Sequence, residues 1–117
     1  MRENKLVDLS VTLAIDALRF CDTVKGHASL VNQFERSVTS IGANIHEANY
    51  AHGTADFIAK MQIALKECYE SEYWLALFDR ANLTDKEAVR RLRDQCGTVR
   101  RILIASINTA KERIKTN

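Results

Sequence analysis

The chain has 117 residues, a formal net charge of +2, four glycines and no proline. This length suits one folded unit with its own apolar core, so we treat residues 1–117 as a single domain. The scarcity of helix-breaking residues indicates an all-α fold. The amino-terminal stretch lacks the pattern of a secretory signal, and no apolar run is long enough to span a membrane. A cytoplasmic protein without membrane attachment is expected.

Apolar residues at helical spacing predict a first helix over residues 5–24, ended by Gly26 in the left-handed conformation. The apolar face of this helix is unusually wide. One seam consists of Leu6, Leu13, Ala17, Phe20 and Val24, and the seam beside it consists of Val7, Val11, Ala14, Leu18 and Cys21. Two seams indicate contact with more than one neighbouring surface.

A second helix is predicted over residues 29–51 and a third over residues 55–81, because apolar residues recur three and four apart in both. Between them, Gly53 is expected to supply a positive φ, and Thr54 to accept hydrogen bonds from the first amides of the third helix. The polar stretch from Ser40 to Phe57 therefore spans a helix-turn-helix corner.

Thr84 and Glu87 have the spacing of a capping box, which predicts the start of a fourth helix that continues to about residue 115. At about 1.5 Å per residue this helix is roughly 45 Å long, longer than the first two helices can cover. Another subunit is expected to cover its end. Four amphipathic helices joined by short loops favour an antiparallel up-down-up-down bundle.

Three polar residues, Ser37, Asn44 and Glu72, fall on or beside the apolar seams of the second and third helices. A buried carboxylate needs a partner, so we predict that the Asn44 amide pairs with Glu72 and fixes the helix register. The alternative is a general base with a raised pKa. Gly42 and Gly97 lie within helices, where glycine costs about 1 kcal/mol relative to alanine, so both are predicted to allow close helix packing.

Motifs for metal or cofactor binding are incomplete or missing. His46 and Glu47 begin an HExxH pattern, but Tyr50 occupies the position of the second histidine. Cys21, Cys68 and Cys96 are far apart without CxxC spacing, and we interpret them as buried thiols. No metal, cofactor or catalytic residue is predicted. A small hydrolase or metal enzyme using Glu72, Glu47 and His46 is the least favoured alternative.

Charge is distributed unevenly along the chain. From Asp85 onward, nine basic and four acidic residues give a balance of +5, against −3 for the first 84 residues. One outer face of the fourth helix carries the candidate nucleic-acid-binding residues Arg90, Arg93, Arg100, Arg101 and Lys111. The alternative is a solvated face neutralised by acids of the third helix. No aromatic residue interleaves with these arginines, so stacking of single-stranded bases is not indicated.

Two segments carry a family resemblance: "SIGANIHEA" from Ser40 to Ala48, and "DFIAKMQIALKECYESEYWL" from Asp56 to Leu75. They resemble the four-helix-bundle proteins encoded in intervening sequences of large-subunit ribosomal RNA genes. The positions that agree are Ser40, Ile41, Asn44, Ile45, Glu47, Phe57, Ala64, Leu65, Glu67, Glu70, Glu72 and Leu75. The chain departs from the family pattern at His46 and at Ala48-Asn49, where small residues and glycine are common.

The resemblance implies a four-helix bundle that assembles as a homopentamer with a central opening and has no known catalytic activity. A related accessory protein of diversity-generating retroelements is similar in fold, and it binds nucleic acid and a reverse transcriptase through a basic pentamer surface. By this analogy RNA or DNA is the expected partner, besides further copies of the chain. A protein-protein scaffold without nucleic acid is the alternative.

Overall fold

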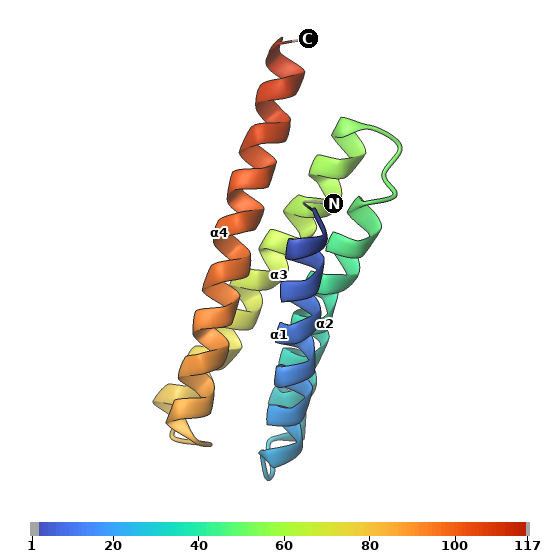
Figure 1. The fold of residues 1–117 in the computed structure, drawn as a ribbon. Coiled ribbons are helices and arrows are strands. Elements are labelled where there is room, and N and C mark those ends of the chain that lie inside the picture. The colour runs from blue at the N-terminus through green and yellow to red at the C-terminus, as the bar shows by residue number, and fades with distance from the viewer. Residues whose placement is uncertain (1–2, 117) are drawn as a thin grey trace.

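The computed structural model describes residues 3–116 and contains four α-helices in this range. They are α1 (Glu3–Thr23), α2 (Ala28–Ala48), α3 (Thr54–Arg80) and α4 (Lys86–Thr116). The turns α1–α2 and α3–α4 lie at one end of the molecule and the turn α2–α3 at the other (Figure 1). Each helix packs against two others, in the cyclic order α1, α2, α3, α4. The predicted all-α, up-down-up-down bundle is confirmed.

The core lies along the bundle axis and follows the predicted seams. Leu13, Ile41, Leu75 and Leu103 contribute one buried side chain from each helix. Near the end that holds the α1–α2 turn, the rings of Phe20, Phe34 and Phe78 meet edge to face, with centroids 5.3 to 6.0 Å apart. Cys21, Cys68 and Cys96 are buried free thiols, as predicted.

The turns contain the expected glycines, but the predicted cap residues are wrong. Gly26 and Gly53 both have positive φ, at 77° and 151°. Thr54 is the first residue of α3 and its side chain caps nothing; instead the Asp56 carboxylate accepts a hydrogen bond from the His52 amide. Helix α2 ends three residues earlier than predicted, because amides 49–51 bond to carbonyls three residues back.

The capping box predicted at the start of α4 is also absent. The Asp85 carboxylate, not the Thr84 hydroxyl, accepts a hydrogen bond from the Glu87 amide at 3.1 Å. The Glu87 side chain pairs with Arg90 and Arg91 rather than turning back to the cap. Asp85 is therefore the N-cap, one residue later than the sequence pattern indicated.

The helices differ in length, and this leaves one end of the bundle incomplete. Helix α4 has 31 residues and α1 has 21. Figure 1 shows the last turns of α4 extending past the start of α1, next to the end that holds the α2–α3 turn. The expectation that helices 1 and 2 would not cover the fourth helix is correct for the described residues.

Candidate nucleic-acid interface

Helices α2 and α3 share a buried polar contact, but its residues differ from those predicted. The hydroxyl oxygens of Ser37 and Ser71 lie 2.9 Å apart, and Ser37 Oγ also donates to the Phe34 carbonyl at 3.0 Å. Ser37 was predicted as a core polar residue, and Ser71 was missed. Both side chains are almost fully buried. Among the described residues, this pair, rather than Asn44 with Glu72, forms a buried polar link between α2 and α3.

The predicted contact between Asn44 and Glu72 is wrong. Asn44 Nδ2 donates to the carbonyl and hydroxyl oxygens of Ser40, one turn earlier on its own helix, at 2.9 and 3.1 Å. Glu72 faces α4, where Arg100 Nε donates to both carboxylate oxygens at 3.2 Å. Both partners of the Glu72–Arg100 pair are partly exposed. Glu72 is therefore an ion-pair residue at the α3–α4 seam.

The two glycines predicted to allow close packing differ in their surroundings. A Cβ atom on Gly42 would lie 3.3 Å from Ser10 Oγ, so Gly42 does permit the close approach of α1 and α2. A Cβ atom on Gly97 would instead meet the guanidinium groups of Arg101 at 3.3 Å and Arg100 at 3.6 Å. Gly97 thus lies beneath two arginines of its own helix, and the interpretation as a helix-helix contact is wrong for it.

The four arginines of the predicted basic face, but not Lys111, line an open cleft of about 880 Å³ along the α3–α4 seam. Many of its cations are paired with acids. Arg90 contacts Glu87 and Asp94 on α4, and Lys86 and Arg93 contact Asp79 of α3. Pairing with Glu87 raises the pKa of Arg90, and pairing with Arg90 lowers the pKa of Glu87. Asp79 therefore neutralises part of this face, as the alternative interpretation of the sequence expected for acids of the third helix.

Two predicted cations remain without an acidic partner among the described residues. Arg101 donates to the Thr98 hydroxyl at 3.3 Å. Lys111 is exposed and lies ten residues further along α4. Burial and the charge of Glu70 raise the pKa of Glu67, against the opposing charges of Lys66 and of Arg36 on α2. Glu70 itself accepts from Trp74 Nε1 of its own helix at 3.1 Å. The unneutralised part of the face is therefore centred on Arg101 and Lys111.

The structure brings an aromatic residue of α3, Tyr69, to this face. The Arg100 guanidinium lies 5.9 Å from the centre of the Tyr69 ring. Tyr69 and Tyr73 are both exposed. The expectation that no aromatic group accompanies the arginines is correct within α4 and wrong for the folded chain, because α3 supplies the rings. The two tyrosines were missed because a pattern read along one helix does not show its neighbour.

Glu47 and His46 are not assembled with Glu72 into one site. Glu47 accepts from Lys60 Nζ at 3.0 Å near the α2–α3 turn, and the His46 ring tilts against Tyr50. Glu72 follows Ser71, which contacts Ser37, ten residues before Glu47 on α2. Ten helical residues correspond to about 15 Å. Among the described residues, no three His, Cys, Asp or Glu side chains are grouped as a metal site.

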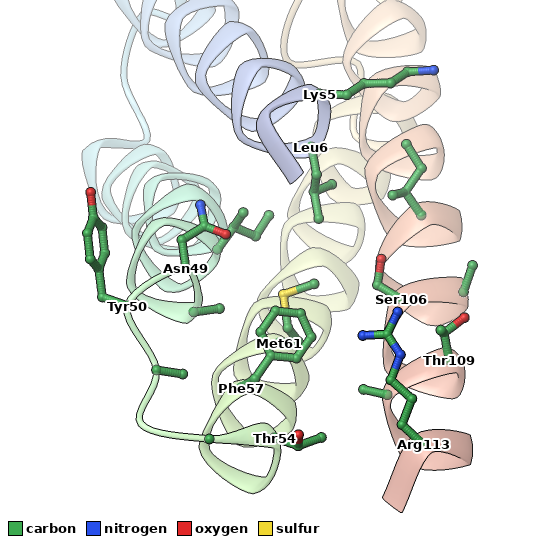
Figure 2. Close-up of a pocket in the computed structure, with 17 residues that line it drawn as sticks. Lys5, Leu6, Asn49, Tyr50, Thr54, Phe57, Met61, Ser106, Thr109 and Arg113 are labelled. Carbon is green, nitrogen blue, oxygen red and sulfur yellow. The ribbon is translucent and has the colours of Figure 1, made fainter. Parts of the chain in front are cut away.

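The incomplete end of the bundle forms a second hollow, also of about 880 Å³. Figure 2 shows Leu6 at the start of α1, Phe57 and Met61 of α3, and Ser106 and Arg113 of α4 around it. Its lining is more apolar than that of the α3–α4 cleft.

In the part of the chain that the structure describes, no helix is both long and apolar enough to cross a membrane.

The fold and these contacts define a small antiparallel four-helix bundle whose charged side chains pair across the α3–α4 seam. The chain belongs to the 23S rRNA-intervening sequence protein family, whose sequence profile matches residues 2–105. The predicted resemblance is confirmed. A solved structure of a protein of unknown function from the S23 ribosomal protein family of Bacteroides thetaiotaomicron is similar to it, with 35% identity and a TM-score of 0.85. The match covers 92% of this chain and 99% of that one. No curated protein matches the chain.

Proposed function

We propose that this chain is a non-enzymatic subunit of a homopentamer that binds nucleic acid through α4. The observation that carries the binding proposal is the charge left on α4 after pairing. The segment from Asp85 has a surplus of +5. Asp79 and Glu72 of α3 offset part of it, and Arg101 and Lys111 keep their charge. A ring of identical subunits repeats this surplus, and repeated cations favour a polyanion over a single small anion.

The proposal of self-assembly is supported by an apolar stripe on the outer face of α1. Val11, Ile15 and Leu18 are 49%, 42% and 39% exposed, and they follow one another at spacings of four and three residues. Partly buried Val7 and Ala14 border the stripe. A continuous apolar helix face of this kind is typical of a contact between subunits. Val11 and Leu18 belong to the second seam predicted from the sequence, whereas Ile15 was assigned to neither seam.

Native mass measurement tests the assembly. We expect five times the chain mass for the wild type and a smaller species for Ile15→Glu, because a carboxylate in the contact would be desolvated without a partner. Ile63→Glu is the matched control, since Ile63 of α3 is 43% exposed and lies outside the α1 stripe. A monomeric wild type would contradict the proposal, as would equal dissociation of both variants.

Salt-dependent binding tests the nucleic-acid partner. The slope of log K against log salt should be steep for the wild type and should decrease by about one for each phosphate contact removed. We expect Arg101→Ala and Lys111→Ala to reduce the slope. Arg90→Ala should have little effect, because Arg90 is already paired with Glu87 and Asp94. Arg19→Ala on α1 is the control for net charge. Affinity insensitive to salt and to Arg101 would contradict binding through α4.

The end hollow favours a second candidate, a scaffold that holds another protein. Its apolar lining includes Leu6, Phe57, Met61 and Ile102, which are suited to an apolar side chain from a partner. A protein partner held there should remain bound after nuclease treatment and should be lost from Ala105→Glu, since Ala105 is an exposed part of the lining. Retention of the partner by Ala105→Glu would argue against this role for the hollow.

A further inference from the structure

The exposed surface of α3 carries two neighbouring aromatic side chains, of which Tyr69 contacts Arg100 of α4. Tyr69 is 52% exposed and Tyr73 is 56% exposed, although both belong to a helix whose other aromatic residues are at least partly buried. They are four residues apart, so their rings project from the same side of α3 at successive turns. Exposed tyrosines at adjacent turns form a short row of aromatic surfaces, which meets the cations of α4 at Tyr69.

Both rings are supported on one side by neighbouring groups. The Arg100 guanidinium lies over the Tyr69 ring, and Glu72 fixes that guanidinium through two hydrogen bonds of 3.2 Å. Tyr73 meets the half-buried Trp74 ring at 5.0 Å, and Trp74 Nε1 donates to Glu70 at 3.1 Å. Rings held in this way lose little freedom when a flat ligand stacks on their open surfaces.

The charges around the row suit a polyanion with exposed bases. Arg100, which contacts Tyr69, also pairs with Glu72, so this carboxylate does not repel a phosphate at full strength. Arg101 follows on α4 and lies over Gly97, where it has no acidic partner among the described residues. A strand whose bases stacked on the tyrosines would bring its phosphates close to this guanidinium.

From this geometry we propose that Tyr69 and Tyr73 are stacking platforms for unpaired bases, so that the ligand of the α3–α4 face is single-stranded nucleic acid. The inference rests on the proposed function and names its ligand class. Tyr69 and Tyr73 are separated by about 6 Å along the helix axis, more than the 3.4 Å between stacked bases of one duplex strand. Each ring therefore receives a base from an extended strand. Bases within a duplex are already stacked and do not offer their faces to the rings.

Fluorescence anisotropy with a labelled oligothymidine, and with a duplex of the same length, tests the proposal. We expect Tyr69→Leu and Tyr73→Leu to weaken single-strand binding by about fivefold or more each, because every lost base stack reduces affinity by at least that factor. Tyr69→Phe and Tyr73→Phe retain the ring and should bind as the wild type does. Tyr50→Leu is the matched control, because Tyr50 is 73% exposed but lies at the α2–α3 turn.

A second readout uses Trp74, which is the only tryptophan of the chain and touches Tyr73. Its emission should change when the single strand binds and should not change with the duplex.

Equal affinity for both nucleic acids, with no effect of either leucine variant, would overturn the stacking proposal and leave α4 phosphate binding intact. Salt-independent affinity or no binding would overturn both proposals. A changed native mass of the leucine variants would place the rings between subunits and overturn the stacking role.

Discussion

A methyl group at position 42 would crowd the neighbouring helix, whereas one at position 97 would not. Replacement by alanine gains about 1 kcal/mol of helix propensity at either site. At Gly42 the new methyl group would press on Ser10 Oγ, which is buried and donates to the Val7 carbonyl at 2.8 Å. At Gly97 it would be tight only against the Arg101 guanidinium at 3.3 Å, the end of an exposed flexible side chain, because Arg100 at 3.6 Å is at an ordinary contact distance.

Denaturant unfolding of the two alanine variants tests this difference. We expect Gly97→Ala to raise the free energy of unfolding by about 0.5–1 kcal/mol and Gly42→Ala to give no increase. Equal stabilisation by both changes would show that α1 and α2 have room at Gly42.

The buried thiols make the stability of the bundle sensitive to alkaline pH. Burial raises the pKa of Cys21 to about 11 and that of Cys96 to about 12, from an ordinary value of 9.0, and it raises the pKa of Cys68 as well. Above pH 9 the unfolded chain releases these protons and the native chain keeps them. The native state then binds more protons, so the free energy of unfolding falls as pH rises.

Comparison with Cys96→Ala isolates the contribution of one thiol. Between about pH 8 and pH 10, the variant should lose about 1 kcal/mol less stability than the wild type, because one proton-linked group has been removed. Urea unfolding of the wild type and of Cys96→Ala at both pH values measures the stability that each protein loses. The same pH dependence in wild type and variant would mean that other groups cause the alkaline loss.

Residue positions on the helices were predicted better than their partners. Apolar spacing placed Ser37 and Glu72 near the seams, and both are at least partly buried. Ser71 and Glu72 differ by about 100° around α3, so the rotation of the helix about its axis decides which of them faces α2. The sequence does not determine this rotation, which depends on the packing of all four helices. Arg100 was therefore missed as the partner of Glu72.

At the level of elements, the helix ranges were predicted better than the residues that cap the helices. All four helices were predicted within three residues, because the periodicity that defines them extends over many residues. Their caps depend on one side chain, and adjacent candidates such as Thr84 and Asp85 satisfy similar patterns. The structure selects Asp85, whose carboxylate accepts from the second amide of α4.

Substitution of the two candidates tests which residue caps α4. Asp85→Ala should lower the free energy of unfolding by about 1 kcal/mol, because it removes both the hydrogen bond and a negative charge near the helix N-terminus. Thr84→Ala, the neighbouring control, should change stability by less than half of that. Thermal or denaturant unfolding of both variants makes the comparison. A larger loss for Thr84→Ala would restore the predicted capping box.

At the scale of the whole molecule, self-assembly and folding should be linked. If copies associate through the α1 stripe, the native assembly is favoured by protein concentration and the unfolded chain is not. The thermal midpoint should therefore rise as the wild-type protein is concentrated. Ile15→Glu disrupts the stripe and should unfold at a midpoint independent of concentration.

Differential scanning calorimetry over a wide concentration range measures this dependence. Ile63→Glu, which changes an equally exposed isoleucine on α3, should retain the concentration dependence of the wild type. A subunit whose fold needs no neighbour would give the same midpoint at every concentration in all three proteins. That result would mean that the exposed face of α1 does not join copies of the chain, because a contact that stabilises only the native state must shift the midpoint with concentration.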